Sequence, residues 1–584
     1  MIVKIGYDVE MQGLTRKWKT PPATNPANNL RDRILEARGI TSRSDYEAFL
    51  DPKLLQLDDP DEMPGATQAA TILAQAIRDE KKVLIFGDYD ADGITAATVL
   101  YHVISAATGK EGPPIYIPDR MDEGYGIQPE AIDKFFESGV DLVISVDCGI
   151  TAIEAANRAK ELGISLIITD HHKPRGDGKL PECAVIVHPG IPGLPGSSSN
   201  DSAPATPFAG VGVAYQLAWA FARVWSQSPT VNERLKQALL DMVPIVAIGT
   251  IADMVPLVNS NRIFARWGLQ LLPMTTNPGL RAIMDELDTP DKKLNSAHIS
   301  FGIAPLINAV GRLSQAAEAV DLLTHLNGDL ATGAAKHLAT TNRERQKVQR
   351  KIIAEALEQI EEKNLAEQPI IILQNDDWAR GVVGVAAGKC IETHYRPTIL
   401  FASDGDQLVG SARSISGFSI FDALSACTEH IVKFGGHDMA AGLTIDRDSF
   451  EPFVAAMTAY SRNAITPEQL IRTAQPDVVA DLHEISHTVA VEIEKIGPFG
   501  MGNPIPVVQV MGVKVYDVRA MGNKGSHLSL KVGTKRVRCI WWGHGDLVER
   551  ISTGSRIDIV AKIKVNEFRG RSNAELDIID LRLI

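Results

Sequence analysis

The stretch VLIFGDYDADGITAATVL, from Val83 to Leu100, decides the fold of this chain. It begins with an apolar run of the kind that forms a buried strand, and it closes with a helix-like run. Between the two, Asp88, Asp90 and Asp92 stand at alternate positions. Carboxylates so close together repel one another, so an ordered turn at this place needs a cation or basic partners. The stretch therefore predicts a strand, a strongly acidic turn and a helix.

A calcium loop and a solvated turn are the two simplest explanations of these aspartates. An EF-hand loop also reads D-x-D-x-D-G, and it ends with a bidentate Glu at position twelve. Counted from Asp88, position twelve is Val99, which cannot bind a cation, and the preceding residues are strand-like. The sequence therefore argues against calcium. A solvated acidic turn remains open on this stretch alone.

The bulk properties are those of a soluble globular protein. The 584 residues suggest three to four domains, and 45% of them are hydrophobic and 22% charged. No run of about eighteen apolar residues and no signal-like N-terminus occur, so we expect no membrane span. The five scattered cysteines are typical of thiols in a reducing compartment such as the cytoplasm. A net charge of −13 argues against a protein that coats nucleic acid everywhere, but it allows a local basic groove.

Strand-like and helix-like runs alternate after Lys82, which predicts βαβ units and a buried parallel sheet. The strand-like runs are Val83–Phe86, Pro114–Ile117, Leu142–Val146, Leu166–Thr169 and Ala184–Val187, with helix-like runs such as Thr95–Ala107 and Ala152–Leu162 between them.

The rest of the chain divides by composition. A helical stretch (Asn28–Leu50) lies in a polar lead-in, a Pro/Gly/Ser loop (Pro189–Pro207) precedes helices up to Met284, and Thr340–Asn364 reads as one long exposed helix. A second α/β stretch follows, and short alternating strands from about Pro476 suggest a small barrel. We therefore expect a lead-in (1–65), a catalytic α/β domain (66–285), a connector with the long helix (286–365), a second α/β lobe (366–465) and a barrel (466–584).

Three of the predicted strands end on groups that can bind metals. In an open parallel sheet such groups meet at the carboxyl edge of the strands. Several carboxylates mixed with histidine suit Mn²⁺ or Mg²⁺, and the lack of cysteine ligands argues against structural zinc. Two such ions would clamp a phosphoryl group and activate a water. The groups are Asp88, Asp90 and Asp92 after the first strand, Asp147 after the next, and Asp170, His171 and His172 after the third.

A fourth acidic group stands in VAIGTIADMVPL, where Asp253 lies inside an otherwise apolar helical segment. A buried charge is costly unless it is paired or bound to a metal. A helix cap or a carboxylate bonded to backbone would also explain this residue, and Asp241 competes for the same role.

In this order, GDYDADG, VDCGI, TDHHKP and GTIADMVPL resemble the four motifs of the DHH phosphoesterase superfamily. Three further stretches narrow the resemblance to its single-strand-specific DNA exonucleases. These are IPDRMDEGYGI (Ile117–Ile127), INAVGRL (Ile307–Leu313) and FGGHDMAAGLTI (Phe434–Ile445). The resemblance runs from about residue 30 onward. It implies a DHH catalytic domain, a DHH-associated second lobe that grips substrate, and a C-terminal OB-fold.

The resemblance also implies roles for single residues. Two Mn²⁺ or Mg²⁺ ions would be held by Asp90, Asp92, Asp147, His171 and Asp253, with Asp147 in the bridging position. Asp88 and His172 would act beside the metals, and Arg312 would bind the substrate phosphate. The further residues implied in substrate binding are Asn308, Arg413, Gly435, Gly436 and His437.

The barrel adds a second place for nucleic acid, since OB-folds bind single strands with a basic groove and aromatic stacking. Residues 521–545 contain five basic and no acidic side chains. Alternate residues of a strand face opposite ways, so one of Trp541 and Trp542 should be core and the other can stack. The basic residues expected to contact DNA are Lys531, Arg536, Arg538 and Arg569.

Two short stretches depart from the pattern of the superfamily. Ala379 and Arg380 replace a usual His-Pro, and Gly388 and Lys389 stand where other residues are common. Both lie in the second lobe, so they bear on strand-end recognition and leave the metal chemistry untouched.

The resemblance implies a 5′→3′ exonuclease on single-stranded DNA that releases mononucleotides in DNA repair and recombination. A single-strand-binding protein and a helicase are candidate partners. A DHH phosphodiesterase of short oligonucleotides or cyclic dinucleotides is one alternative. A non-catalytic replication scaffold is another, although such scaffolds have lost ligands that this chain keeps.

Overall fold

The computed structural model describes residues 11–119, 123, 126–191, 194, 206–289, 293–313, 316–568 and 570–584, without the side chains of 310–313 and 568. Arg569 and part of the stretch Ile117–Ile127 therefore lie outside the described residues, and Arg312 is described in its backbone alone. Two compact units result: unit 1 comprises Met1–Tyr46, Arg345–Ile496 and Ile505–Ile584, and unit 2 comprises Glu47–Glu344 and Gly497–Pro504. The five-part division expected above remains a prediction.

Unit 2 contains the predicted parallel sheet, with its strands in the order β4-β3-β5-β6-β7. Gly87 pairs with Val146, and Val146 pairs with Thr169, so β3, β5 and β6 end at the same level. The five strands are β3 (Val83–Gly87), β4 (Ile115–Tyr116), β5 (Leu142–Val146), β6 (Ser165–Thr169) and β7 (Val185–Val187).

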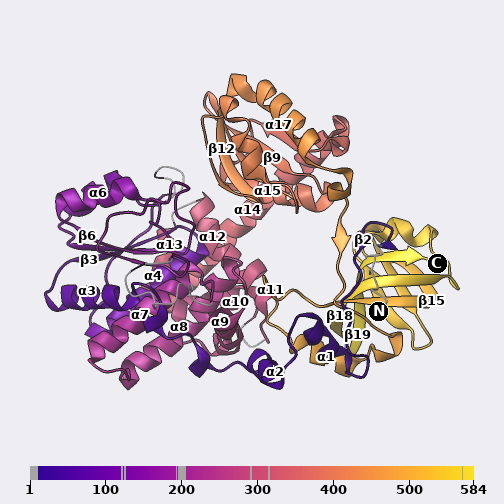
Figure 1. Cartoon of the computed structure of the whole chain (residues 1–584), viewed down its shortest axis with the longest axis horizontal. Coiled ribbons are helices and arrows are strands. Elements are labelled where there is room, and N and C mark those ends of the chain that lie inside the picture. Colours follow the sequence, from indigo (N-terminus) through magenta and orange to yellow (C-terminus); the bar gives the residue numbers. More distant parts are fainter. Residues whose placement is uncertain are drawn as a thin grey trace, which may run out of the picture. The chain divides into compact units, whose positions relative to one another are not determined.

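Helices cover both faces of this sheet (Figure 1). On one face α3 (Ala66–Arg78), α4 (Ala91–Thr108) and α7 (Gly210–Ser226) pack on side chains such as Ile85. On the other face α5 (Pro129–Glu137) and α6 (Ile153–Leu162) pack on neighbours such as Phe86. Because both faces are buried, the strands read as continuous apolar runs rather than as alternating ones.

Further helices complete unit 2. Among the described helices, α8 alone has the length and composition of a membrane span, but 67% of that stretch is buried inside the protein. It packs against α4, α7 and α9, as a core helix does. The helices are α8 (Glu233–Ala252), α9 (Asn259–Leu271), α10 (Pro278–Glu286), α11 (Ser296–His298), the π-helical turn η4 (Ile299–Ile303), α12 (Ala304–Leu313) and α13 (Ala317–Thr324).

Two predicted helices were placed wrongly. The stretch Asn28–Leu50 is not one helix but two, α1 (Leu30–Ala37) and α2 (Arg43–Leu50), because Gly39 takes a left-handed backbone (φ +82°) that ends the first. The long helix α14 (Gly328–Glu362) begins well before Thr340. Its first turns bury small and apolar side chains, so packing extends a helix whose later part is polar.

Unit 1 contains the second α/β lobe, a mixed sheet in the order β11-β12-β10-β9-β8. This lobe was predicted from the stretch after Pro369. Its strands are β8 (Ile371–Asn375), β9 (Thr398–Asp404), β10 (Gln407–Arg413), β11 (Lys433–His437) and β12 (Ala440–Asp446), and its helices are α15 (Arg380–His394), α16 (Ile420–Ser425) and α17 (Phe450–Ala464).

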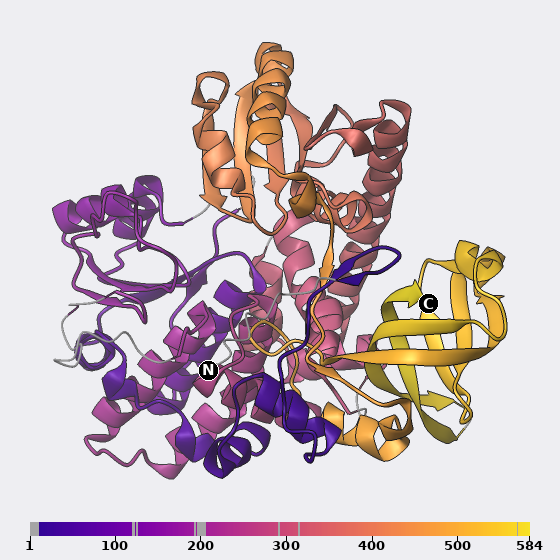
Figure 2. The same ribbon diagram turned by 45° about the vertical axis from the view of Figure 1, so that its right-hand side comes forward.

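The C-terminal strands form a closed barrel in the order β14-β15-β16-β17-β19-β18, with β15 also paired to β18 (Figure 2). Trp541 is 3% exposed and Trp542 is 51% exposed, which confirms that one tryptophan belongs to the core and shows that the other is half-exposed. The elements are β14 (Val478–Val479), α18 (His487–Glu494), β15 (Val507–Met521), β16 (His527–Val532), β17 (Val537–Trp541), β18 (Arg556–Phe568) and β19 (Arg571–Leu583).

The N-terminal residues are fastened to this barrel. The short strands β1 (Met11–Gln12) and β2 (Lys17–Trp18) form a hairpin, and β2 pairs with β13 (Thr473–Ala474). Asp580 of β19 is fully buried and accepts hydrogen bonds from the backbone of the hairpin turn and from Trp18 Nε1 at 2.7 Å. The start of the chain is therefore part of unit 1.

Candidate functional site

Three buried aspartates follow the ends of three adjacent strands. Because β3, β5 and β6 end at one level, Asp88, Asp147 and Asp170 stand in one row at the carboxyl edge of the sheet. All three are at most 4% exposed. Asp147 also has a left-handed backbone (φ +61°), which is uncommon outside glycine and marks a constrained position. The expectation that the acidic groups meet at one edge is confirmed.

The acidic and histidine side chains form three overlapping groups, in each of which the candidate ligand atoms lie within 4.8 Å of one another. Asp147 and His171 each belong to two of them, as residues close to two cations would. The groups are Asp88, Asp90 and Asp147; Asp92, His171 and Asp253; and Asp147, His171 and His172.

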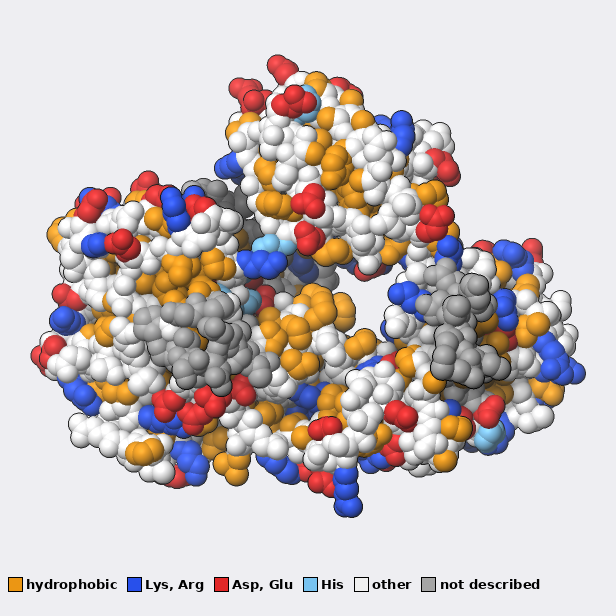
Figure 3. Space-filling model, in the orientation of Figure 1, with side chains coloured by type: hydrophobic (Ala, Val, Ile, Leu, Met, Phe, Trp, Pro, Cys, Tyr) orange, Lys and Arg blue, Asp and Glu red, His pale blue; other side chains and the backbone are white. Residues whose placement is uncertain are grey.

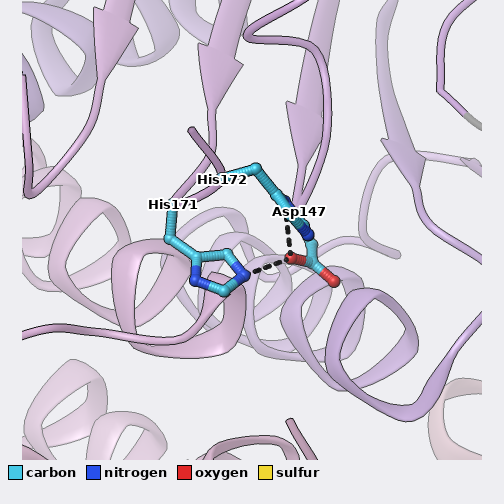
Figure 4. Close-up of side chains that lie close together, drawn as sticks. All are labelled: Asp147, His171 and His172. Carbon is cyan, nitrogen blue, oxygen red and sulfur yellow. Dashed lines mark ion pairs between the residues drawn. The ribbon is translucent and has the colours of Figure 1, made fainter. Parts of the chain in front are cut away.

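The ring of His171 points toward the carboxylate of Asp147 (Figure 4). Its Nε2 lies 3.2 Å from Asp147 Oδ1, 3.6 Å from Asp253 Oδ2 and 3.9 Å from Asp92 Oδ2. Burial, followed by the charge of His172, lowers the pKa of His171 to about 4, so its ring is neutral at pH 7. Within the described residues, the buried atoms His171 Nε2 and Asp147 Oδ1 have no hydrogen-bond partner. A neutral nitrogen lone pair among carboxylate oxygens is a donor set that fits a divalent cation.

Two helix N-termini orient the first carboxylates. Asp90 caps α4, because its Oδ1 accepts the backbone N–H groups of Asp92 (2.8 Å) and Gly93 (3.1 Å). The Asp92 carboxylate accepts the N–H groups of Gly210 (2.7 Å) and Val211 (2.9 Å) at the start of α7. Asp90 therefore has an ordinary structural role, as the cap of a helix. One of its carboxylate oxygens also lies within 4.8 Å of candidate ligand atoms of Asp88 and Asp147.

The start of α7 has room only for glycine at position 210. A Cβ atom on Gly210 would lie 2.4 Å from Asp147 Oδ1, far below any real contact. The close approach brings the helix N-terminus against the carboxylates, where its partial positive charge offsets part of their negative charge.

Three carboxylates of the cluster have a raised pKa. Burial, reinforced by neighbouring carboxylates, raises the pKa of Asp92 and of Asp147 well above its usual range. Burial and then the charge of Asp90 raise the pKa of Asp253 to about 7. Divalent cations would reverse these shifts by supplying positive charge where several carboxylates repel one another. The residues present therefore fit a two-cation site, although the ligand roles of individual residues remain predictions.

Asp170, one of the strand-end groups expected to be able to bind a metal, was given no role by the resemblance, and the structure places it behind His172. Its Oδ1 accepts the N–H groups of His171 and His172 and lies 2.8 Å from Nδ1 of the His172 ring, while Oδ2 accepts the N–H of Ile150 at 2.9 Å. Burial opposes the charge of His172, but the hydrogen bond to Asp170 and its charge raise the pKa of His172 to about 9. Its place directly after β6, level with Asp88 and Asp147, was the available signal.

Asp253 occupies a different place from the one predicted. It lies at the C-terminal cap of α8, not inside the helix, and its side chain is 24% exposed, more than Asp92 or Asp147. Helical periodicity cannot locate the last residue of an apolar helix, which explains the error. Asp241 lies near the middle of α8, where it accepts a hydrogen bond from Gln237 at 2.8 Å, and it belongs to none of the three groups.

Two asparagines support the site from other helices. Asn308 of α12 accepts the N–H of Ala91, between the paired aspartates, at 2.7 Å. Asn261 of α9 is fully buried and donates through Nδ2 to the carbonyls of Pro207 (2.7 Å) and Pro256 (3.0 Å). Asn261 therefore connects the approach to α7, which binds Asp92, with the segment after Asp253. No motif drew attention to it, because its contacts are tertiary.

The residues predicted in the second lobe lie together. Arg413 and His437 both pair with Ala440, from the strands on either side of β12, so the three side chains share one face of the sheet. Gly436 adopts φ +145°, and a Cβ there would lie 2.3 Å from the carbonyl of Ala440, whereas Gly435 has open space. Their contact with substrate remains a prediction.

The two charged departures in this lobe form ion pairs. Arg380, the first residue of α15, pairs with Asp404 at the end of β9, and Lys389 pairs with Glu392 one turn further along the helix.

Two of the basic residues predicted in the barrel, Lys531 and Arg538, lie beside acidic side chains. Lys531 and Arg538 stand directly opposite each other on β16 and β17. Arg538 pairs with Glu575 at 3.1 Å, and Lys531 lies 3.9 Å from Asp517. Trp542 adjoins this face, with its ring centroid 4.9 Å from that of His527. Lys, Arg, Asp and Glu side chains are mixed over the face of the molecule in Figure 3 as well.

Three family models match this chain. The N-terminal domain of the DHH family matches residues 82–250, the DHHA1 domain matches residues 367–463, and the RecJ OB domain matches residues 476–580.

Single relatives match almost the whole chain. The single-stranded-DNA-specific exonuclease RecJ of Bacillus subtilis is 37% identical over 94% of this chain and 67% of its own length. The same exonuclease of Salmonella typhimurium is 30% identical over 98% of this chain and 99% of its own length.

Solved structures agree with these sequences. The crystal structure of Thermus thermophilus RecJ with Mn²⁺ covers 96% of this chain and 78% of its own, at 27% identity and a TM-score of 0.78. The Mg²⁺ complex from the same organism covers 96% of this chain and 77% of its own, at 25% identity and a TM-score of 0.71.

Proposed function

The chain belongs to the RecJ family of the DHH phosphoesterases, and on that premise we propose how it acts on its substrate. It is a single-stranded-DNA-specific exonuclease that uses Mn²⁺ or Mg²⁺. We propose that it starts at the 5′ end of the strand, hydrolyses one phosphodiester bond at a time and releases 5′-mononucleotides.

The observation that carries the proposal is that two groups of candidate ligands share Asp147. Two ions would be held by Asp90, Asp92, Asp147, His171 and Asp253. Asp88 would lie beside the ion that Asp90 and Asp147 hold. The ions, when bound, lower the pKa of a water and neutralise charge on the phosphate oxygens. His172, held through Nδ1 by Asp170, can present its other ring nitrogen as a donor to the phosphate.

The substrate would be gripped at three places. Asn308 and Arg312 lie on α12, whose Asn308 is bonded to Ala91 within the metal site. An arginine there supplies a planar fork for a phosphate. Arg413 and the Gly435–His437 stretch would hold the terminal nucleotide. Lys531, Arg538 and Trp542 of the barrel would hold nucleotides further along the strand by charge and stacking.

The cellular role follows from the kind of substrate. An exonuclease that needs a free single strand depends on an enzyme that separates duplex DNA, and single strands in a cell are covered by binding protein. We therefore place the chain in cytoplasmic DNA repair and recombination, beside a helicase and a single-strand-binding protein.

The test uses a single-stranded oligonucleotide labelled at either end, with Mn²⁺, the parent protein and an Asp147→Asn variant. We expect the 5′ label to appear as a mononucleotide at once with the parent and not with the variant. Early release from the 3′ end would contradict the polarity. Cleavage of dinucleotides alone would indicate a small-substrate phosphodiesterase, and no cleavage at all would indicate a scaffold.

A further inference from the structure

The segment Gly497–Pro504 belongs to unit 2, although the chain on both sides of it belongs to unit 1. Its carbonyls accept hydrogen bonds from unit 2. Leu257 N donates to Met501 O at 2.8 Å, Arg262 Nη2 donates to Gly497 O at 3.1 Å, and Ser296 Oγ donates to Phe499 O. A stretch that the sequence assigns to the barrel therefore packs on the catalytic unit.

The segment lies against the residues that follow Asp253. A Cβ on Gly500 would lie 2.8 Å from Leu257 Cδ1, and a Cβ on Gly502 would lie 3.2 Å from Pro256 Cβ. Gly502 also has φ +73°, a backbone that glycine adopts without strain. Asn261 holds the carbonyl of Pro256 at 3.0 Å. Pro256 and Leu257 are thus fixed both by the segment and by Asn261.

Asp253 lacks the backbone hydrogen bonds that hold three other aspartates of the site. Asp90, Asp92 and Asp170 each accept at least two backbone N–H groups through their carboxylates. Among the hydrogen bonds of the described residues, none ends on the carboxylate of Asp253. Its position is therefore set by its own backbone, which runs from the end of α8 through a left-handed Met254 (φ +61°) to Pro256.

We propose that Gly497–Pro504 is a positioning element of the metal centre, which holds the backbone of Asp253 in place for the cation that Asp92, His171 and Asp253 share. The proposal rests on the two-cation site proposed above. Residues that orient metal ligands from behind commonly change metal affinity about 10–100-fold when they are altered. The segment would be such a support, supplied by a stretch far along the chain.

The test is Gly502→Ala in the full-length protein, with Gly163→Ala as its matched control. Gly163 caps α6 in the same unit, has φ +76° and has nothing within 4 Å of an added Cβ atom, so it reproduces the backbone strain alone. Mn²⁺ binding is measured by titration calorimetry without substrate, and kcat and KM are measured on a labelled single strand at several Mn²⁺ concentrations.

We expect Gly163→Ala to bind two Mn²⁺ ions as the parent does. Gly502→Ala should bind one ion normally and the other about tenfold more weakly. Its kcat should fall at low Mn²⁺ and recover at high Mn²⁺, with KM for the strand unchanged. Equal Mn²⁺ affinities in the two variants would overturn the proposal.

Two further outcomes are distinguishable. A parent that does not bind two ions would remove the two-cation site itself, and with it this inference. If Gly502→Ala fails to fold, Ser296→Ala decides, because it removes the hydrogen bond to Phe499 O without backbone strain. Weaker binding of one Mn²⁺ ion in that variant supports the proposal, and unchanged binding of both contradicts it.

Discussion

Asp170 and His172 form a hydrogen-bonded ion pair, with Asp170 Oδ1 2.8 Å from His172 Nδ1. Despite burial, the hydrogen bond and charge of His172 lower the pKa of Asp170 to about 2, while Asp170 raises that of His172 to about 9. The pair is therefore charged throughout the neutral range. It keeps a cationic ring beside carboxylates that are themselves hard to ionise.

Replacing Asp170 by Asn should lower the pKa of His172 by more than one unit, because the ring loses its charged partner. NMR titration of the metal-free protein measures this shift directly. His188→Ala is the control, because it removes the bonds of His188 to the carbonyl of His172 and to the N–H of Gly190 but leaves Asp170 in place. An unchanged His172 titration would show that Asp170 is not its main partner. We also expect kcat at pH 8 to fall by roughly tenfold or more, with KM for the strand little changed.

Gly210→Ala should disable the metal centre while the fold persists. Its Cβ would collide with Asp147 Oδ1, so the carboxylate must move. We expect Mn²⁺ affinity and kcat to fall about 10–100-fold. Gly333→Ala in α14 is the control, since nothing lies within 4 Å of its added Cβ and alanine favours a helix by up to about 1 kcal/mol. Normal Mn²⁺ binding by Gly210→Ala would contradict the tight packing of α7 on Asp147.

Without metal, the raised pKa of Asp253 should make stability depend on pH. The folded state holds a proton up to about pH 7, whereas the unfolded chain releases it near its ordinary value of 3.8. The stability from this proton is therefore complete below about pH 4 and is lost as the pH rises to about 7. In EDTA, the parent should lose more thermal stability between pH 5 and 7.5 than an Asp253→Asn variant does.

Adding Mn²⁺ should reverse that trend, because the ligands must be deprotonated to bind it. The increase in melting temperature on adding Mn²⁺ should be larger at pH 7.5 than at pH 5.5. A stabilisation that does not change with pH would mean that Mn²⁺ binds away from these carboxylates.

Substitutions of the two adjacent tryptophans should affect DNA binding and folding separately. Trp542→Ala removes a half-exposed ring, so we expect the barrel to fold normally and single-strand affinity to fall about tenfold, in line with 1–3 kcal/mol per stacked base. Trp541→Ala removes a buried ring and should lower the melting temperature. Fluorescence anisotropy with a labelled oligonucleotide and thermal unfolding measure the two effects. An unaltered affinity in Trp542→Ala would remove that ring from the DNA-binding surface.

The meeting of Asp88, Asp147 and His171 could be predicted from the sequence, because parallel strands share a carboxyl edge whatever their order. The identity of the free tryptophan could not be predicted, since alternation alone leaves the two faces of a strand equivalent. Asp253 was assigned to the right site but to the wrong part of its helix, since an apolar run hides the residue at which a helix ends.

The supports of the site were beyond sequence reasoning. Asn261 donates hydrogen bonds to two backbone carbonyls, one of them far from it along the chain. The segment Gly497–Pro504 belongs to unit 2, although the residues on both sides of it belong to unit 1. The sequence of Gly497–Pro504 indicates the barrel, and no motif marks Asn261. Neither supporting contact could be read from the sequence, because each depends on what folds against it. The break between α1 and α2 at Gly39 could not be predicted either, because the apolar pattern of a helix does not show where a single glycine ends it.

The hydrogen bonds to Asp580 have a consequence for synthesis on the ribosome. Thr15 and its acceptor Asp580 lie 565 positions apart. The hairpin β1–β2 is therefore synthesised long before β19, and it can form these hydrogen bonds only when β19 has left the ribosome. Bringing such distant residues together is a slow, entropically costly step that local helix formation does not face. The hairpin is therefore exposed to proteases and chaperones throughout translation. Resistance of the hairpin to proteolysis would show that the barrel has closed.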